Sequence, residues 1–358
     1  MIEIVHSMKE IDRKIWETLV GKDRPETTYQ WFSFGENISM QPKPYYCLAV
    51  YKDEKEEIKG ILPAYYFYVR FGDLFKASGV TYLRRLFPQM KTPFKMTVVH
   101  LPLSCDFRYF GDPTHFNECL QEIENFSRKE HHSSIMIKDS NEKMNLPDYL
   151  SIEIFPEVYI DPYPSWDSYV QDQKGKRGKH IRYEYKKSVD LGTKTYMVEN
   201  LDEYTDLLYE MQVNVFEKNR IFIEFPRNYF RIMDEYLHEY SKCIFSENNG
   251  EITGYLYLLE NDHSISCKYA GRNYETEDSY VYFRLLYELI KYSIKTKKPV
   301  SMEKASYDAK IRRGFKIIEK FCYVKSNYPI VGDLYLSLVK RGNKEAAKRI
   351  EEVRSLQH

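Results

Sequence analysis

A run of short apolar stretches in the second half of this 358-residue chain constrains its fold more than any other feature. Stretches with the composition of β-strands occupy residues 243–246, 252–259 and 264–269. Asn-Asn-Gly and Glu-Asn-Asp lie between them, and such sequences favour the tight turns of hairpins. An amphipathic helical pattern over residues 280–296 and a strand pattern over 300–303 come next. This order predicts an α+β domain in which helices flank a mixed sheet.

The first half of the chain is also mixed. Strand-like or helical spacing occurs in residues 46–51, 58–69, 114–129 and 133–137. Residues 155–164 are rich in proline and lack a helical period, so they are the best candidate for a crossing between domains. The chain is long enough for two cores. We therefore expect two domains, residues 1–160 and 161–358, and no internal sequence repeat is visible.

Composition excludes several classes of protein. Lys plus Arg and Asp plus Glu both number 53, so any basic site must be local and a globally basic nucleic-acid binder is not expected. The six cysteines form no Cys-x-x-Cys pair and have no histidine at metal-ligand spacing, which predicts reduced thiols and neither a metal site nor a disulfide framework. Without a signal segment or a run of about 18 apolar residues, we expect a soluble cytoplasmic protein without a membrane span.

A basic segment at residues 174–187 is the first candidate site. On a helix capped by Ser165, Arg182 lies one turn after Lys179 and one turn before Lys186. Tyr183 shares a face with Lys179, an arrangement suited to a phosphate or nucleotide held between a cation and a ring. A solvated basic face is the alternative that the spacing leaves open. The seven basic residues are Lys174, Lys176, Arg177, Lys179, Arg182, Lys186 and Lys187.

The second candidate site spans residues 303–315. Glu303 ends a predicted strand, and Lys310 stands three residues before Arg313-Gly-Phe, which places charge where a sheet opens. Glu303 is the best placed general base, with Tyr269 and His263 behind it. Cys267 lies on a strand without an identifiable partner, so we expect a buried core cysteine there.

The order of these motifs resembles the FemAB/BioF2-like acyltransferases of the GNAT (Gcn5-related acyltransferase) superfamily, over roughly residues 165–325. Their pattern S-x-x-x-Y, followed by a helix of the form K-x-R-x-x-I-R-R-x-x-R/K-K, is matched at Ser165, Tyr169, Arg177, Ile181, Arg182, Lys186 and Lys187. Two further matches are Gly254-Tyr-Leu-Tyr with Tyr269-Ala-Gly, and Glu303 through Lys310 with Arg313-Gly-Phe315. The first half resembles only a degenerate partner domain.

The resemblance implies tandem GNAT-like domains and a V-shaped donor cleft between two strands that splay apart. It also implies amide formation, in which an activated acyl or aminoacyl group passes to an amine. Lys310 would stabilise the oxyanion, and Glu303 and Tyr269 complete the expected catalytic set. We expect Lys310→Ala to abolish turnover with little loss of stability; the rival role is a surface salt bridge. Arg313 would bind donor phosphate or pair with Glu303. The expected donor- and substrate-binding residues are Lys176, Arg177, Lys179, Arg182, Tyr183, Lys186, Arg313 and Phe315.

The sequence limits the possible acyl donors but does not identify one. No tightly bound cofactor is expected, and a thioester of CoA or of an acyl-carrier protein is favoured as co-substrate. However, residues 271–278 lack the glycine pattern that holds a pyrophosphate and are acidic, which argues against ordinary CoA binding at that loop. Two alternatives stay open: an aminoacyl-tRNA-dependent, FemX-like aminoacyltransferase, and a non-catalytic RNA-binding protein. The acyl group, the acceptor and the oligomeric state stay open as well.

Overall fold

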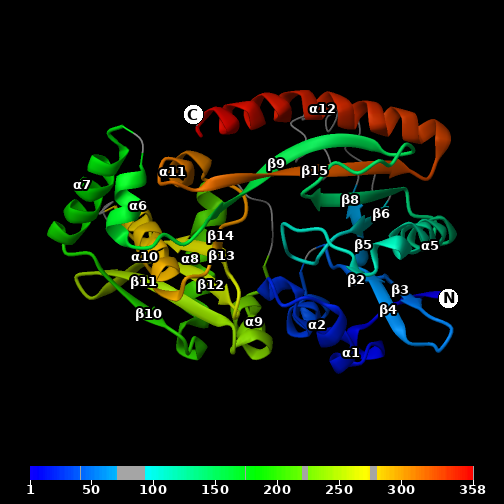
Figure 1. Ribbon diagram of the computed structural model, residues 1–358, viewed down its shortest axis with the longest axis horizontal. Helices are drawn as coiled ribbons and strands as arrows, with labels where there is room; N and C mark the ends of the chain where they lie inside the picture. The colour runs from blue at the N-terminus through cyan, green and yellow to red at the C-terminus, as the bar shows by residue number, and fades with distance from the viewer. Residues whose placement is uncertain (41, 71–92, 174, 220–224, 275–279, 358) are drawn as a thin grey trace. The chain divides into compact units, whose positions relative to one another are not determined.

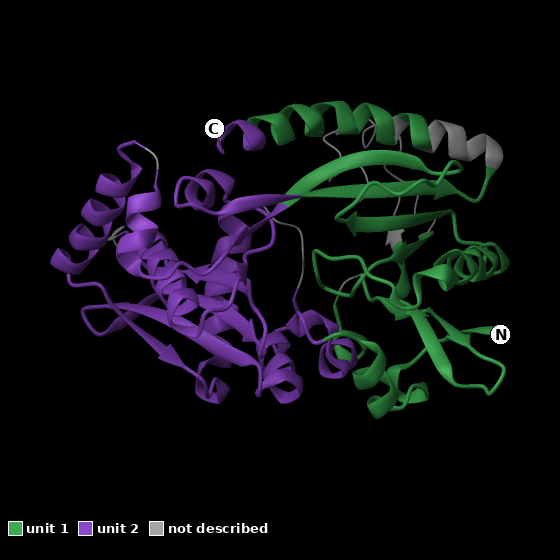
Figure 2. Cartoon of the chain, viewed as in Figure 1, with its two compact units in different colours: residues 1–21, 35–156, 319–352 green, residues 22–34, 157–318, 353–358 purple. Residues whose placement is uncertain are grey.

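The computed structural model describes residues 1–40, 42–70, 93–173, 175–219, 225–274 and 280–357 (Figure 1). Lys174 and the acidic residues 275–278, both part of the predictions above, lie outside the described residues. The chain forms two compact units, which we describe separately (Figure 2). Unit 1 consists of Met1–Gly21, Gly35–Pro156 and Glu319–Glu352, and unit 2 of Lys22–Phe34, Glu157–Ile318 and Val353–His358.

Unit 1 contains an antiparallel sheet in the order β1-β3-β4-β7 and the strands β2, β5, β6 and β8 of a second sheet. Helix α5 connects β6 to β8. The elements that lie wholly in this unit are β1 (Ile2–Val5), α1 (Arg13–Leu19), β2 (Tyr45–Tyr46), β3 (Leu48–Lys52), β4 (Ile58–Leu62), β5 (Ala64–Arg70), β6 (Pro93–Val99), β7 (Phe110–Gly111), α5 (Phe116–Lys129) and β8 (Ser134–Ser140).

Unit 2 contains the strand order β10-β11-β12-β13-β14. Its own elements are α6 (Trp166–Asp172), α7 (Arg177–Asp190), β10 (Lys194–Val198), α8 (Thr205–Asn219), α9 (Tyr229–Leu237), β11 (Ser241–Asn248), β12 (Glu251–Glu260), β13 (Ile265–Arg272), α10 (Val281–Thr296), β14 (Val300–Ser301) and α11 (Tyr307–Ile311). Four elements have residues in both units: α2 (Tyr29–Asn37), β9 (Leu150–Ile160), β15 (Lys316–Ser326) and α12 (Pro329–Ser355).

The two units repeat one plan. In unit 1, the antiparallel hairpin β5-β6 is followed by α5 and by β8, which is parallel to β6. In unit 2, the hairpin β12-β13 is followed by α10 and by β14, which is parallel to β13. An antiparallel strand then continues each sheet, β15 in unit 1 and the end of β9 in unit 2. Each unit thus takes this strand from the other half of the chain, which is why the units interleave in sequence.

The two faces of the unit 2 sheet carry different helices. Gly254 on β12 leaves room for α10, because a Cβ there would lie only 2.8 Å from Cγ1 of Val281. The next residue, Tyr255, points to the opposite face and donates a hydrogen bond of 3.0 Å to the carbonyl of Leu208 on α8. Helix α7 packs in turn on α10. The sheet is therefore buried on both faces, as its apolar strands require.

The α+β class is confirmed, and most predicted elements are present within a few residues. Four details differ. The predicted strand over residues 46–51 is divided between β2 and β3, which pair with different neighbours. The predicted strand over residues 58–69 is two strands, because Pro63 separates β4 from β5 and each pairs with different neighbours. The predicted basic helix is broken, so that Ser165 caps α6 and the basic residues begin α7. Residues 155–160 lie in β9, and the units divide there, between Pro156 and Glu157. The domain boundary after residue 160 stays a prediction.

Candidate functional site

Strands β13 and β14 separate soon after they meet. Their parallel pairing consists of Ile265 with Val300 and Ser266 with Ser301. Beyond this point the chain after β14 stays with β9, since the amide of Met302 donates to Val158 and the amide of Val158 donates to Glu303, both over 2.9 Å. Strand β13 instead continues along β12 to Arg272. We call the divergence, with Lys268 and Tyr269 on one strand and Met302 and Glu303 on the other, the β13–β14 fork.

A β-bulge places Lys268 in the fork. Tyr257 on β12 pairs with Tyr269 and the next residue, Leu258, pairs with Cys267, so Lys268 is the extra residue on β13. A bulge of this kind re-aims a side chain and disrupts the ladder locally. The Lys268 side chain has no solvent exposure, and its ammonium contacts the carboxylate of Glu303 across the fork.

A segment from the beginning of the chain completes the surroundings of Lys268. The Glu26 carboxylate lies 3.4 Å from the Lys268 ammonium and accepts a hydrogen bond of 2.8 Å from Ser266. The ring centroid of Trp31 lies 4.8 Å from the same ammonium, a cation–π contact. Glu26 and Trp31 are both fully buried.

A third carboxylate and a second cation adjoin this group. Glu157, also fully buried, accepts a hydrogen bond of 2.5 Å from the guanidinium of Arg24 and another from the hydroxyl of Ser301, the last residue of β14. Arg24 also lies 3.9 Å from Glu26. We call Arg24, Glu26, Glu157, Lys268 and Glu303 the fork cluster. Its members come from three distant parts of the sequence.

The fork cluster separates the pKa values of its carboxyl groups. Burial raises the pKa of Glu303; Lys268 opposes this, whereas Glu26 and Glu157 add to it, and the result lies above the usual value. Burial also favours a raised pKa for Glu26, but Lys268 and Arg24 outweigh it and hold that pKa below the usual value. Glu303 therefore takes up a proton at higher pH than Glu26 does, a division typical of acid–base sites.

Tyr269, Cys267 and His263, the other candidate reactive groups, differ in burial and in their hydrogen-bond partners. Tyr269 is hydrogen-bonded to Tyr229 over 2.6 Å between the hydroxyl oxygens, and burial raises its pKa, so its hydroxyl stays protonated and cannot act as a base at neutral pH. Burial raises the pKa of Cys267 to about 12, which leaves a poorly nucleophilic thiol, as expected for a core cysteine. His263 is exposed in a turn where its amide donates to Asn261 over 2.9 Å.

Lys310 lies next to the fork but its ammonium faces backbone. It is buried and donates hydrogen bonds of 2.8 Å to the carbonyl of Met302 and 3.4 Å to that of Lys304. Glu303, Ala305 and Ser306 in the same turn have φ values of 49°, 76° and 52°. Such left-handed conformations are costly for residues other than glycine and need support from their surroundings. Lys310 thus supports the turn that presents Glu303.

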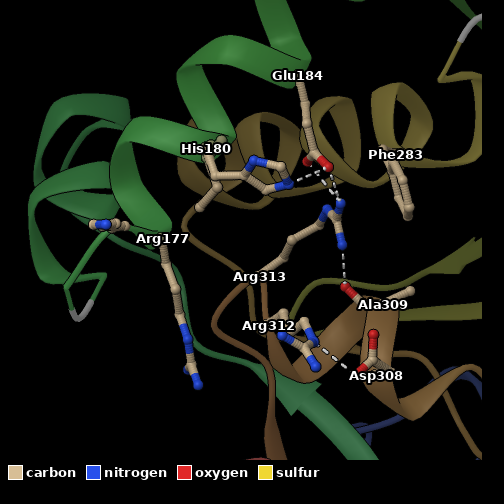
Figure 3. Close-up of a pocket in the computed structure, with 10 residues that line it drawn as sticks. Arg177, His180, Glu184, Phe283, Asp308, Ala309, Arg312 and Arg313 are labelled. Atoms are coloured by element: carbon tan, nitrogen blue, oxygen red, sulfur yellow. Dashed lines mark hydrogen bonds and ion pairs between the residues drawn. The ribbon is translucent and has the colours of Figure 1, made fainter.

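A pocket of about 490 Å³ lies among α7, α10 and α11 (Figure 3). Helices α10 and α11 are those that follow the two strands of the fork. Arg313 lines the pocket, but it forms two hydrogen bonds with Glu184, of 2.7 and 2.6 Å, and its guanidinium stacks 3.6 Å from the Phe283 ring centroid. The pocket is lined by Lys176, Arg177, His180, Ile181, Glu184, Phe283, Asp308, Ala309, Arg312 and Arg313.

The predicted binding residues are distributed between this pocket and other places. Arg313, which follows α11, pairs with Glu184 of α7 rather than with Glu303. Phe315 belongs to the hydrophobic core of unit 2. Lys176 and Arg177 reach the pocket. Within the described part of the chain, four further residues lie exposed on α7 without an ion pair: Lys179, Arg182, Tyr183 and Lys186.

The fork cluster contains residues that the sequence did not single out. Lys268 carries a weak signal, since it is the one charge within the otherwise uncharged strand Ile265–Arg272 before its final residue. Glu26 carries none, because 242 residues separate it from Lys268. Only the packing of residues Lys22–Phe34 within unit 2 brings the two together.

Comparison with protein-family models and with curated proteins finds no match for the sequence. The fold, in contrast, matches solved structures. FemX aligns with a TM-score of 0.54 and 11% identity, covering 90% of this chain and 96% of that one. A tandem GNAT protein from the clavulanic acid biosynthesis pathway aligns with a TM-score of 0.53 and 10% identity, covering 92% and 99%. The C-terminal domain of a putative lysylphosphatidylglycerol synthetase from Agrobacterium fabrum aligns with a TM-score of 0.53 and 9% identity, covering 93% and 97%.

These matches define the fold as that of the GNAT acyltransferases. More specifically, the chain has the tandem form, with two GNAT-like units, which confirms the fold expected from the motifs. At such low identity the likeness extends to the fold alone. Among the described residues, no helix combines the length and apolar character needed to cross a bilayer, and no three or more His, Cys, Asp or Glu side chains are grouped to hold a metal.

Proposed function

We propose that this protein forms amides by transferring an acyl or aminoacyl group from an activated donor to an amine, with the chemistry at the β13–β14 fork. The observation that carries the proposal is the divergence of two parallel strands after Ser266 and Ser301, with the Lys268–Glu303 pair across it. This arrangement supplies a titratable carboxylate where the donor cleft of the fold would lie.

The proposed reaction uses Glu303 as general base. The amine nitrogen attacks the acyl carbonyl carbon, a C–N bond forms, and the bond from carbon to the donor sulfur or oxygen breaks. The leaving atom departs with the bonding electrons and takes up one proton, while Glu303 accepts the proton lost by the amine. The raised pKa of Glu303 supports this role. The proton accepted by Glu303 then passes to the leaving atom, and Tyr269, whose hydroxyl stays protonated, is proposed to donate a hydrogen bond to that atom.

The oxyanion of the tetrahedral intermediate needs a cation or hydrogen-bond donors, and one such donor is worth about 3–4 kcal/mol. Lys310 is proposed for this role by resemblance. The Lys310 ammonium donates a hydrogen bond to the carbonyl of Met302, the residue that precedes Glu303. This bond places Lys310 near Glu303 but also occupies the ammonium. Lys268 is therefore proposed as a second candidate, since it contacts Glu303 directly.

The pocket beside α7 is the proposed entry for an anionic donor. Lys176 and Arg177 would contact phosphate there, and Lys179, Arg182, Tyr183 and Lys186 offer further cations and a ring along the exposed face. A thioester of CoA or of a carrier protein is the favoured donor. An aminoacyl-tRNA is the alternative, for which the exposed cations Lys179, Arg182 and Lys186 of α7 are the supporting observation.

The test is an assay for amide formation with acyl-CoA, acyl-carrier protein and aminoacyl-tRNA, each offered with a panel of primary amines and analysed by mass spectrometry. Glu303→Gln is expected to lower the rate about 10²–10⁴-fold. Glu251→Gln, which alters an exposed residue at the start of β12, serves as the matched control and should leave the rate unchanged. No transfer from any donor, together with RNA binding that weakens steeply with salt, would instead favour the non-catalytic alternative.

A further inference from the structure

We infer that residues Lys22–Phe34 form part of the reaction site of unit 2, and that Glu26 is a positioning residue that acts as the permanent counter-ion of Lys268. This inference rests on the proposed function. Its consequence is that Glu303 is freed from neutralising Lys268 and can take up the proton of the amine. The segment lies far from the fork in sequence, and no motif connects the two.

The segment is fastened to unit 2 on both sides of Glu26. Before it, the side chains of Asn261 and Ser264 donate hydrogen bonds of 2.8 and 2.6 Å to the carbonyls of Lys22 and Asp23. Arg24 pairs with Glu157 at the end of β9. After it, the buried ring of Trp31 covers the Lys268 ammonium. Glu26 is thus held in place by contacts to the hairpin turn and β9, and by its own bond to Ser266.

The number of charges in the fork cluster explains why Lys268 needs Glu26 as a counter-ion. With Glu303 ionised, the cluster holds three carboxylates, Glu26, Glu157 and Glu303, against two cations, Arg24 and Lys268. With Glu303 protonated, two carboxylates face two cations. An uncompensated charge is costly in a buried site. Counted without the neighbouring Lys310, whose ammonium is engaged by the carbonyls of Met302 and Lys304, the fork cluster is therefore balanced when Glu303 carries a proton, and Glu26 keeps Lys268 compensated at that moment.

Several charged or titratable groups of the described chain lie near Glu303 and affect its titration. Arg24 and Glu26 come from the N-terminal segment, and Glu157 from β9. From the elements packed around the fork come Cys267, Lys268 and Tyr269 of β13, Tyr229 of α9 and Lys310 of α11. Among them, Glu26 is the carboxylate that contacts the same ammonium as Glu303. Removing the charge of Glu26 leaves Glu303 as the carboxylate whose contact with the Lys268 ammonium is strengthened.

The experiment is a carbon-13 NMR titration of the full-length protein labelled at the glutamate side-chain carboxyl carbons. Glu303→Gln and Glu26→Asp assign the two resonances. In wild type, Glu26 should keep the chemical shift of a carboxylate over the pH range in which Glu303 titrates. In Glu26→Gln, the midpoint of Glu303 should fall by about one pH unit, and the acid limb of kcat/KM should move with it. Glu26→Asp keeps the charge and should restore most of the wild-type midpoint, and Glu251→Gln should not change it.

An unchanged Glu303 midpoint in folded Glu26→Gln overturns the inference, even if amide formation is found. If Glu26→Gln does not fold, the wild-type titration tests the inference. If Glu26 takes up a proton before Glu303 does as the pH falls, Glu26 is not the permanent counter-ion of Lys268. Because the NMR titration needs no donor, it is separate from the test of function. A shifted midpoint without any acyl transfer would remove the proposed function and leave the electrostatic role of Glu26 in place.

Discussion

Buried charges in unit 2 are compensated by partners from distant parts of the chain. The effect of substituting one of these residues on stability therefore cannot be predicted from the residues next to it in sequence. Lys310 donates to backbone carbonyls, and Arg313 is held by Glu184. Both residues belong to a motif that resemblance assigns to chemistry. Their contacts give each of them a structural role as well, and this changes what mutagenesis should find.

Lys310→Met is expected to lower the free energy of unfolding by about 1–3 kcal/mol, because the carbonyls of Met302 and Lys304 lose their donor in a buried site. Urea unfolding measures this loss. The matched control is Lys316→Met, which removes a half-exposed pair with Asp161 and should cost less than about 1 kcal/mol. A Lys310→Met variant as stable as wild type would show that the structural contacts are dispensable and return Lys310 to a purely catalytic role.

Asp234 should make the stability of the protein depend on pH. Burial and the nearby Asp202 carboxyl raise the pKa of Asp234 to about 6. The folded state therefore holds a proton that the unfolded state has released, so this contribution is present below about pH 4 and lost as the pH rises through 6. Asp234→Asn should raise Tm relative to wild type at about pH 7.5. Thermal unfolding at several pH values tests this, and a Tm difference that does not shrink toward pH 4 would contradict it.

At the scale of elements, both units bring a parallel strand pair to a point where their pairing ends and a contact between polar side chains joins the two strands. In unit 1, β6 and β8 pair up to Val99 and Ile137, and beyond them His100 contacts Asp139 over 2.9 Å. In unit 2 the corresponding contact is between Lys268 and Glu303. The repetition lies in topology, since no sequence repeat accompanies it, and hydrogen bonding of the backbone preserves it without particular side chains.

A buried ion pair joins Glu184 of α7 to Arg313, which follows α11. Glu184→Gln is expected to lower the free energy of unfolding by about 3–5 kcal/mol, because Arg313 is then buried without its carboxylate. Asp308→Asn is the matched control, since it breaks an exposed pair with Arg312 and should cost less than about 1 kcal/mol. Equal effects of the two substitutions, measured by chemical unfolding, would mean that the pair does not hold α7 in place.

At the scale of the whole molecule, the interleaving of the units determines how the chain can be divided. Unit 2 needs Val158 of β9 as the partner of Met302 and Glu303, and it includes residues Lys22–Phe34. We expect a fragment of residues 161–358 not to fold by itself, because it lacks both segments. Circular dichroism and NMR spectra of that fragment test this. A dispersed spectrum and a cooperative unfolding transition would show that the segments are not required.

Much of the order of helices and strands could be predicted from the sequence, because each element depends on a pattern of neighbouring residues. The hairpins of β11, β12 and β13 follow from alternation and from Asn-Asn-Gly, and α10 follows from its apolar stripe. The candidate site was accessible in part. Glu303 and Tyr269, which lie at the fork, were among the residues predicted, and their catalytic roles stay predictions. Phe315 is a core residue, and Arg313 has a buried partner on α7.

Local patterns are enough to predict the class of fold and the exposed cations of α7, since periodicity and charge spacing are properties of neighbouring residues. Which charges face one another depends on how distant segments pack. The bulge at Lys268, the arrival of Glu26 across 242 residues and the exchange of β9 and β15 between units depend on backbone pairing over long separations. A buried charge acquires its partner and its pKa only when the surrounding segments have packed, and local sequence does not record which segment that will be.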